Sequence, residues 1–74
     1  MALDGGKDGL EIIEKILKQA PVFLKPDGWL LIEIGKGQSA VLAKHRKKNK
    51  EFQNLRFVKD LNGIDRVLVA QKNG

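Results

Sequence analysis

The stretch that decides the fold runs from Trp29 to Ile34 and reads Trp-Leu-Leu-Ile-Glu-Ile. A nearly continuous apolar run of this kind is typical of a strand covered on both faces, as in the sheets of α/β proteins. The preceding residues Lys25-Pro26-Asp27-Gly28 form a turn signal, with proline at the second position and glycine at the fourth. Gly35-Lys36-Gly37 ends the run. The sequence therefore predicts a buried strand in an α/β fold.

A helix is predicted on the N-terminal side of this strand. Apolar residues recur at helical spacing, namely Leu10, Ile13, Leu17 and Ala20. Asp8 stands at the N-cap position, and Glu11 follows at the spacing of a capping box. The helix is expected to reach Gln19. Because Pro21 disfavours helix at the residue before it, residues 22–24 are either a kinked last turn or a loop.

The residues after the strand predict a second helix and two more strands. The helix is expected from Gln38 to about Asn49, and the strands over residues 55–59 and 66–70, before a frayed tail. A strand, a crossover helix and a strand in one sheet should be right-handed and parallel. The Asn62-Gly63 pair is a strong hairpin signal, so the last strand should run antiparallel beside its predecessor. These elements predict a three-stranded mixed sheet with two helices packed on it.

Composition limits the class of protein. The chain of 74 residues should form one small domain of modest stability, because such a domain buries only about 60–65% of its unfolded surface. It contains no cysteine, so disulfides and thiolate metal sites are excluded. No apolar stretch is long enough to span a bilayer, and no secretory signal opens the chain. A cytoplasmic location and no membrane partner are the expectations.

The net charge of +5 is concentrated in one run of residues. Residues 1–43 carry five lysines and six acids, whereas residues 44–74 carry nine cations and three acids. The run contains five cations in seven residues, namely Lys44, Arg46, Lys47, Lys48 and Lys50. It is interpreted first as a solvated helix end, where cations are favoured. Weak, sequence-independent contact with nucleic acid is the alternative, although no aromatic residue interleaves the run for base stacking.

Several motifs in order resemble the C-terminal end of the HemK (PrmC) family, the release-factor glutamine methyltransferases. They are Gly5-Gly6-Lys7-Asp8-Gly9-Leu10, Leu24-Lys25-Pro26-Asp27-Gly28-Trp29-Leu30, Glu33-Ile34-Gly35 with Gln38, and Lys59-Asp60-Leu61-Asn62-Gly63-Ile64-Asp65-Arg66. The resemblance extends from Leu3 to about Ala70. A Lys-Pro-Asp-Gly turn before an apolar strand is common to many class I methyltransferases, whereas the ordered combination is much more specific.

The resemblance implies the fold and the function of a parent enzyme. It implies that residues 1–74 are a single partial domain, the C-terminal fragment of a class I, Rossmann-like methyltransferase sheet. The chain would hold strands five, six and seven of seven, with the last strand inserted antiparallel between the other two. The parent would transfer a methyl group from S-adenosylmethionine to a glutamine side-chain amide of a peptide chain release factor.

The resemblance carries no catalytic, cofactor-binding or metal-binding residue onto this sequence. The family binds its cofactor with a glycine-rich loop and its glutamine with an Asn-Pro-Pro-Tyr motif, and neither occurs in these 74 residues. The fragment alone is therefore expected to be inactive and to bind no cofactor. Met1 stands directly before the first motif. This position favours a chain whose first residue was chosen deliberately or assigned by gene prediction. A parent that methylates another protein or RNA, and a free-standing basic RNA-binding or interaction module, are the alternatives.

Four features of the sequence are candidate sites. Gly35-Lys36-Gly37 lacks both nucleotide-binding fingerprints and is interpreted as a plain strand-to-helix turn. Glu33 stands near the carboxyl end of the apolar strand, which is expected to be the central strand. It would border the active site in a parent enzyme, or it would face solvent in this chain. His45 has no ligand partner at metal spacing and is interpreted as a surface histidine. The charges Lys59, Asp60, Asp65 and Arg66, around the hairpin turn, are interpreted as exposed turn formers.

The apolar run also predicts self-association. If neighbouring strands are missing, Trp29 to Ile34 presents an unpaired apolar edge or face, and such edges promote pairing with another chain. We therefore expect self-association or marginal stability.

Overall fold

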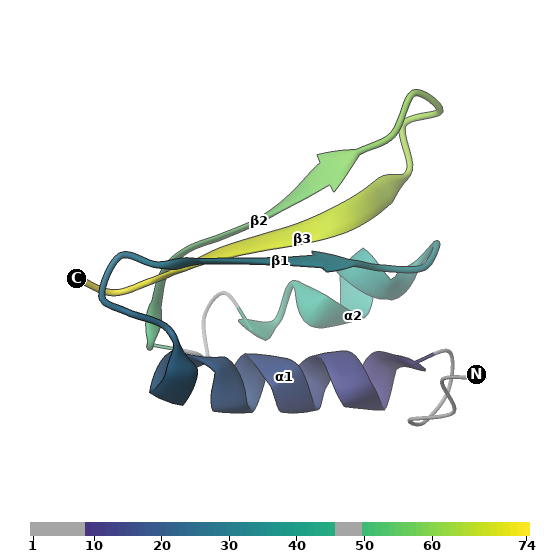
Figure 1. Cartoon of the computed structure of the whole chain (residues 1–74). Coiled ribbons are helices and arrows are strands. Elements are labelled where there is room, and N and C mark those ends of the chain that lie inside the picture. The colour runs from purple at the N-terminus through teal and green to yellow at the C-terminus, as the bar shows by residue number, and fades with distance from the viewer. Residues whose placement is uncertain (1–8, 46–49) are drawn as a thin grey trace.

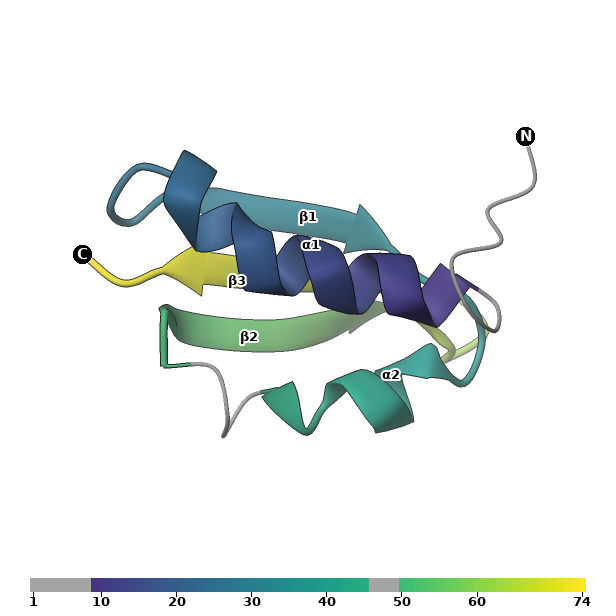
Figure 2. The ribbon, with the colours of Figure 1, turned by 90° about the horizontal axis from the view of Figure 1, so that it is seen from below.

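The protein consists of a three-stranded sheet with two helices on one of its faces (Figure 1). The structure is a computed structural model, and it describes residues 9–45 and 50–74. The elements in chain order are α1 (Leu10–Phe23), β1 (Trp29–Glu33), α2 (Gln38–Leu42), β2 (Phe52–Lys59) and β3 (Asp65–Lys72). Seen from below, α1 and α2 lie side by side against the same face of the sheet (Figure 2).

The strand order is β1-β3-β2, and both pairs of neighbours are antiparallel. β3 follows β2 through the hairpin turn, in which Gly63 has a left-handed φ of 77° and its N–H donates to the Asp60 carbonyl. The antiparallel hairpin predicted from Asn62-Gly63 is confirmed. The insertion of the last strand between the other two is also confirmed. The resemblance implied this insertion, whereas the turn signal alone did not imply it.

Two expectations about the sheet were wrong. β1 and β2 are not neighbours, because β3 occupies the position between them, and the sheet of this chain contains no parallel pair among the described residues. β1 is consequently an edge strand and not the central one. Local strand-helix-strand rules predict that two strands run in the same direction, and β1 and β2 do so. These rules do not say whether a later strand enters between the two.

The helix α1 confirms the periodic pattern and continues further than expected. It runs through Pro21 to Phe23, where the Leu24 N–H donates to the Ala20 carbonyl at 2.9 Å. The last carbonyls of the helix have no intrahelical donor, and the Lys72 ammonium donates to the carbonyls of Pro21 and Leu24 at this end. The helix begins after Gly9, which is its N-cap, whereas the predicted cap Asp8 lies outside the described residues.

The C-terminal elements differ from the prediction in length. α2 ends at Leu42, because residues 43–44 form a turn, and residues 46–49 of the predicted helix lie outside the described residues. Five residues are too few to be stable alone, so the contact of the buried Leu42 with the core maintains this helix. β3 continues through Lys72, so the predicted frayed tail is wrong over residues 71–72. Backbone pairing with β1 and β2 extends the strand that far.

The core lies between the helices and one face of the sheet. Its buried members are Ile13, Leu17, Ala20, Ile34, Leu42, Phe52, Leu68 and Ala70. The opposite face of the sheet has no covering element among the described residues, so Trp29 retains 49% and Leu31 66% of its exposure. The prediction that β1 is covered on both faces is therefore wrong for this chain: only the side of Leu30 and Ile32 is packed.

Candidate functional site

The carboxyl end of β1 and the start of α1 enclose a hollow on the packed side of the sheet. It measures about 290 Å³. Its walls are aliphatic apart from one carboxylate and one amide; the lining residues are Gly9, Ile12, Ile13, Ile16, Ile32, Glu33, Gly35 and Gln38. In open α/β sheets, ligands bind outside the carboxyl ends of strands, and this hollow occupies such a position.

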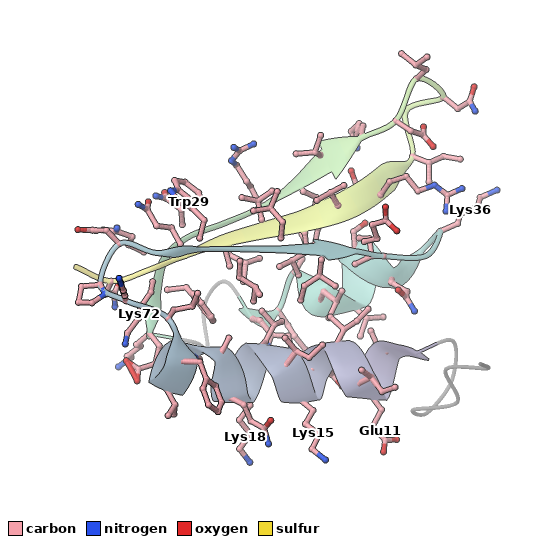
Figure 3. The ribbon with its side chains drawn as sticks, viewed as in Figure 1. Glu11, Lys15, Lys18, Trp29, Lys36 and Lys72 are labelled. Atoms are coloured by element: carbon pink, nitrogen blue, oxygen red, sulfur yellow. The ribbon has the colours of Figure 1, made fainter. Side chains whose placement is uncertain are left out.

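Glu33 is the charged residue of this region. It is exposed, and it also borders a shallower hollow of about 380 Å³ that includes Ile34, Arg66 and Val67. Lys36 projects from the turn after β1 near the same end of the sheet (Figure 3). The prediction that Glu33 faces solvent in this chain is confirmed. Its place at the border of two hollows is also where a parent enzyme would expose it to a ligand.

The Gly35-Lys36-Gly37 turn is held by the side chain of Gln38. The Gly35 N–H donates to Gln38 Oε1 at 2.7 Å, and the Gln38 N–H donates to the Gly35 carbonyl at 3.1 Å. Gly37, whose φ is 86°, is the N-cap of α2. Because the buried Gln38 occupies the backbone donor of Gly35, that N–H is not offered to a phosphate. The interpretation as a structural turn is supported over a nucleotide loop.

His45 is not the isolated surface histidine that the sequence suggested. Its Nε2 lies 3.1 Å from Glu14 Oε2, and the Lys44 Nζ lies 3.4 Å from the same oxygen. The hydrogen bond from His45, followed by that from Lys44 and the charges of both, lowers the pKa of Glu14 below its usual value, although desolvation opposes this. The pair joins α1 to the segment after α2. It was missed because the partners are 31 residues apart.

The charges at the hairpin pair across the turn as well as shaping it. Lys59 Nζ lies 2.8 Å from Asp65 Oδ1, and Arg66 Nε lies 3.1 Å from Asp60 Oδ2. Asp60 Oδ1 also accepts the N–H groups of Asn62 and Ile64. The Ile64 N–H, with smaller contributions from Arg66 and Asn62, lowers the pKa of Asp60. The interpretation as turn formers is confirmed for Asp60, whereas Lys59, Asp65 and Arg66 lie in the flanking strands, and Asp60 and Asp65 are half-buried.

The described residues contain no assembled catalytic group. No cluster of three or more His, Cys, Asp or Glu that could hold a metal is found among residues 9–45 and 50–74. Among the described residues that line the aliphatic hollow, Glu33 is the one with a titratable side chain. In the part of the chain that the structure describes, no helix is long and apolar enough to cross a membrane. What the region can offer is one aliphatic wall and one carboxylate.

Comparison with known proteins gives a consistent group of relatives. The chain is 42% identical over 71 residues to a release factor glutamine methyltransferase of Thermosynechococcus vestitus, covering 96% of the chain and 24% of the relative. It is 44% identical over 68 residues to the enzyme of that name in Geobacter sulfurreducens, covering 90% of the chain and 23% of the relative. By sequence, the chain matches a fragment of the HemK (PrmC) glutamine methyltransferases. It spans about a quarter of the length of the curated relatives it matches.

This match accounts for the order of the sheet and leaves the substrate open. A ribosomal protein uL3 glutamine methyltransferase of Bradyrhizobium diazoefficiens is also similar, with 51% identity over 41 residues, 55% of the chain and 13% of the relative. No family model and no solved structure matches the chain. The α/β fragment with its inserted antiparallel strand is that of a methyltransferase, as expected from the resemblance.

The hollow between α1 and β1 does not fit a methyl donor such as S-adenosylmethionine. That molecule carries a carboxylate, an ammonium group, a ribose and an adenine, each of which needs polar partners. The hollow beside β1 offers aliphatic walls, the Glu33 carboxylate and the Gln38 amide, whose oxygen already accepts the Gly35 N–H. We therefore assign no step of methyl transfer to these residues.

Proposed function

We propose that this chain is the C-terminal part of an S-adenosylmethionine-dependent enzyme that methylates a glutamine side-chain amide in peptide chain release factors. The observation that carries the proposal is the 42% identity over 71 residues to a relative of that name. The strand order β1-β3-β2 supports it, because the resemblance implied this insertion before the fold was known.

In such an enzyme these residues would complete the sheet and border the active site. The hollow between α1 and the carboxyl end of β1 lies where open α/β sheets bind ligands, and Glu33 stands at its rim. The cofactor and the glutamine would be held by a glycine-rich loop and an Asn-Pro-Pro-Tyr motif, neither of which occurs in this sequence. This chain would thus form one wall of the active site and complete the sheet. Residues outside this chain would carry out the chemistry.

A chimeric enzyme tests the proposal. The 71-residue segment of the Thermosynechococcus vestitus relative that matches this chain is replaced by the corresponding residues of this chain. We expect the chimera to methylate a release factor, detected by mass spectrometry of the glutamine peptide. The same chimera with Leu68→Asp is the control, because a charge at this fully buried position disrupts the core. A folded chimera that binds the cofactor but leaves the release factor unmethylated would contradict the proposal.

The substrate is tested in the same assay. The similarity to a ribosomal protein uL3 glutamine methyltransferase covers only 55% of the chain, whereas the release-factor relative covers 96%. We therefore expect the chimera, and the natural parent where its gene is known, to prefer a release factor. Methylation of uL3 by the natural parent, with no methylation of release factors, would contradict the proposed substrate. It would leave the proposed reaction, methylation of a glutamine amide, unchanged.

The isolated chain is expected to be inactive. Its described residues offer no cation to the carboxylate of S-adenosylmethionine at the hollow beside β1. Calorimetric titration of the 74-residue chain with the cofactor should show no binding at micromolar concentrations. Micromolar binding with one site per chain would place the cofactor site within these residues and contradict their role as a wall.

Contact with nucleic acid stays a prediction. Of the basic run, Arg46, Lys47 and Lys48 lie outside the described residues, while Lys44 is engaged with Glu14 and Lys50 is exposed. Phosphate contacts give affinities that fall steeply with salt. A fluorescence titration with generic single-stranded RNA at moderate salt tests this, and no binding at tens of micromolar would remove the hypothesis of a basic RNA-binding module.

A further inference from the structure

Leu61, at the tip of the β2–β3 hairpin, is the most exposed of the large apolar residues that the structure describes. Its relative exposure is 105%, against 66% for Leu31 on the open face of the sheet. Single exposed leucines are common on protein surfaces and need no function. Leu61 is informative only through the backbone that presents it and the end of the sheet at which it stands.

The backbone of this tip is held by hydrogen bonds to Asp60, the residue before Leu61. Asp60 Oδ1 accepts the N–H groups of Asn62 at 2.8 Å and of Ile64 at 3.1 Å. The Asp60 N–H donates to the Ile64 carbonyl at 2.9 Å, and the Gly63 N–H donates to the Asp60 carbonyl at 3.0 Å. A loop that is ordered in advance loses little further entropy when a partner covers it. Leu61 is thus an apolar side chain on a preorganised support.

The hairpin tip stands at the end of the sheet where the proposed function places the active site. β1 and β2 run in the same direction, so the carboxyl end of β1 and the hairpin lie at one end of the sheet (Figure 1). The Ile34 N–H, just after β1, donates at 2.8 Å to the Arg66 carbonyl at the foot of the hairpin. The hollow of about 380 Å³ lies between them and is lined by Glu33, Ile34, Arg66 and Val67. Ligands of open α/β sheets bind outside this end.

The earlier strands of a parent sheet are expected on the other side of the molecule. β3 already pairs on both sides, so a further strand adds at β1 or at β2. The pairing of β2 is interrupted by register shifts near both ends, and β2 carries Arg56 and Lys59; both features are typical of an outer edge. β1 has a regular register and carries neither lysine nor arginine. Earlier strands therefore add at β1, and the hairpin stays at the outer side of the sheet.

The charges beside Leu61 favour a protein over a nucleic acid as its partner. Lys59 Nζ lies 2.8 Å from Asp65 Oδ1, and Arg66 Nε lies 3.1 Å from Asp60 Oδ2. Both cations are thus paired with acids of the same hairpin, whereas binding to phosphates depends on cations that replace counterions. An exposed leucine among internally paired charges instead suits the apolar core of a protein interface.

We propose that Leu61 is a docking residue that contacts the protein substrate outside its glutamine. The inference rests on the proposed function, because it takes the partner to be the release factor that the enzyme methylates. Adjacent strands lie about 4.8 Å apart, so β2 lies about 10 Å from β1. A standard interface covers about 800 Å² of each partner, which corresponds to a disc of roughly 16 Å radius. A folded substrate centred at the carboxyl end of β1 therefore reaches the hairpin, whereas a short peptide does not.

Steady-state kinetics of the chimeric enzyme test this role. Leu61→Ser should raise KM for the whole release factor at least about fivefold, with kcat within about twofold. For a short synthetic peptide that contains the same glutamine, both constants should stay within about twofold, because the peptide does not reach the hairpin. Leu61→Met should behave like the unsubstituted chimera. Val22→Ser is the matched control, because Val22 is 80% exposed and lies in the last turn of α1, at the opposite end of the sheet.

The outcomes separate this inference from the proposed function. A chimera that methylates the release factor with the same KM before and after Leu61→Ser leaves the proposed function in place and overturns the docking role. An equal rise in KM for the release factor and the peptide overturns it too, since Leu61 would then act on the glutamine site or on folding. A folded chimera that binds the cofactor and methylates neither substrate overturns the proposed function, and the docking role with it.

Thiol labelling measures the contact without catalysis. The 74-residue chain has no cysteine of its own, so Leu61→Cys introduces a single thiol into this part of the chimera. Its alkylation, followed by mass spectrometry of the hairpin peptide, should be rapid in the free chimera. It should be at least about tenfold slower with release factor above its KM, whereas alkylation of Val22→Cys should not change. Slow alkylation in the free chimera, or no protection by the release factor, overturns the proposal.

Discussion

The two faces of the sheet are made by the same three strands and differ in what lies against them. On one face, two cross-strand rows of side chains pack under α1 and α2, namely Leu30-Ala70-Leu55 and Ile32-Leu68-Phe57. On the other face, two cross-strand rows of side chains have no covering layer among the described residues, namely Trp29-Gln71-Asn54 and Leu31-Val69-Arg56. The covered face contains the core, and the open face has no layer packed on it among the described residues.

The open face shows that burial can arise within a single layer. Val69, on the central strand, is only 5% exposed although no helix covers it, because Leu31 and Arg56 flank it on the neighbouring strands. Leu31, on the edge strand, has a neighbour on one side only and stays exposed. Position across the sheet therefore decides exposure on the open face, whereas the helices decide it on the covered face.

The largest expected effect is on the covered face. Leu68→Ala removes a fully buried side chain and should lower the free energy of unfolding by about 2–5 kcal/mol. Leu31→Ala, on the open face of the neighbouring strand, should cost less than about 1 kcal/mol in the monomer. Guanidinium denaturation followed by circular dichroism at low micromolar concentration measures both. Equal losses for the two variants would contradict the difference between the faces.

A second effect concerns the contact that ties α1 to the end of β3. Lys72→Met removes the ammonium donor from the Pro21 and Leu24 carbonyls and should cost about 1–3 kcal/mol. Lys18→Met, on the outer side of α1, is the matched control and should change stability by less than about 0.5 kcal/mol. Both are measured by thermal and denaturant unfolding. A Lys72 variant as stable as the control would show that water replaces this cap without loss.

A smaller effect depends on pH. The pKa of Glu14 is lowered in the folded chain, chiefly by the hydrogen bond from His45, so the pair adds stability above the usual glutamate pKa near 4.5. That stability is lost as the pH falls below 4.5 through the folded pKa. Because the carboxylate is partly exposed, we expect less than about 1 kcal/mol. Glu14→Gln should lower stability at pH 6 and leave it unchanged at pH 3; a constant loss at both would show that charge is not the cause.

The smallest expected effect is that of a charge on the open face. Leu31→Lys should change the stability of the monomer by less than about 0.5 kcal/mol, because the side chain projects away from the core. Any larger loss, measured by denaturation at low micromolar concentration, would show that the open face contributes to folding and would reduce the contrast between the faces.

Local patterns predicted most of the elements and only part of their arrangement. The 3.6-residue spacing of Leu10, Ile13 and Leu17 predicted α1, and Asn62-Gly63 predicted the β2–β3 hairpin, because each signal lies within one element or turn. For residues 22–24 the sequence left a last helical turn and a loop as alternatives, and the structure shows helix as far as Phe23. The pairing of His45 with Glu14 was missed because the partners are 31 residues apart.

The candidate site was anticipated in part. Glu33 was expected at the carboxyl end of a strand, and it does stand at the rim of the hollow. The aliphatic walls of this hollow, formed partly by Ile12 and Ile16, were not expected from the sequence. Their exposure depends on β1 being the edge strand, which no local pattern in its residues indicates.

By itself, the sequence determined the resemblance to a family, the alternation of helix and strand, and the antiparallel hairpin. These depend on residue order and on spacings within short segments. Local patterns did not indicate that β3 enters between β1 and β2, which the family resemblance implied, and only the tertiary structure showed which long-range contacts, such as those of Lys72 and Glu14, join the elements. The physical reason is that a strand's residues encode its two faces, whereas its neighbours and coverings come from segments distant in the chain.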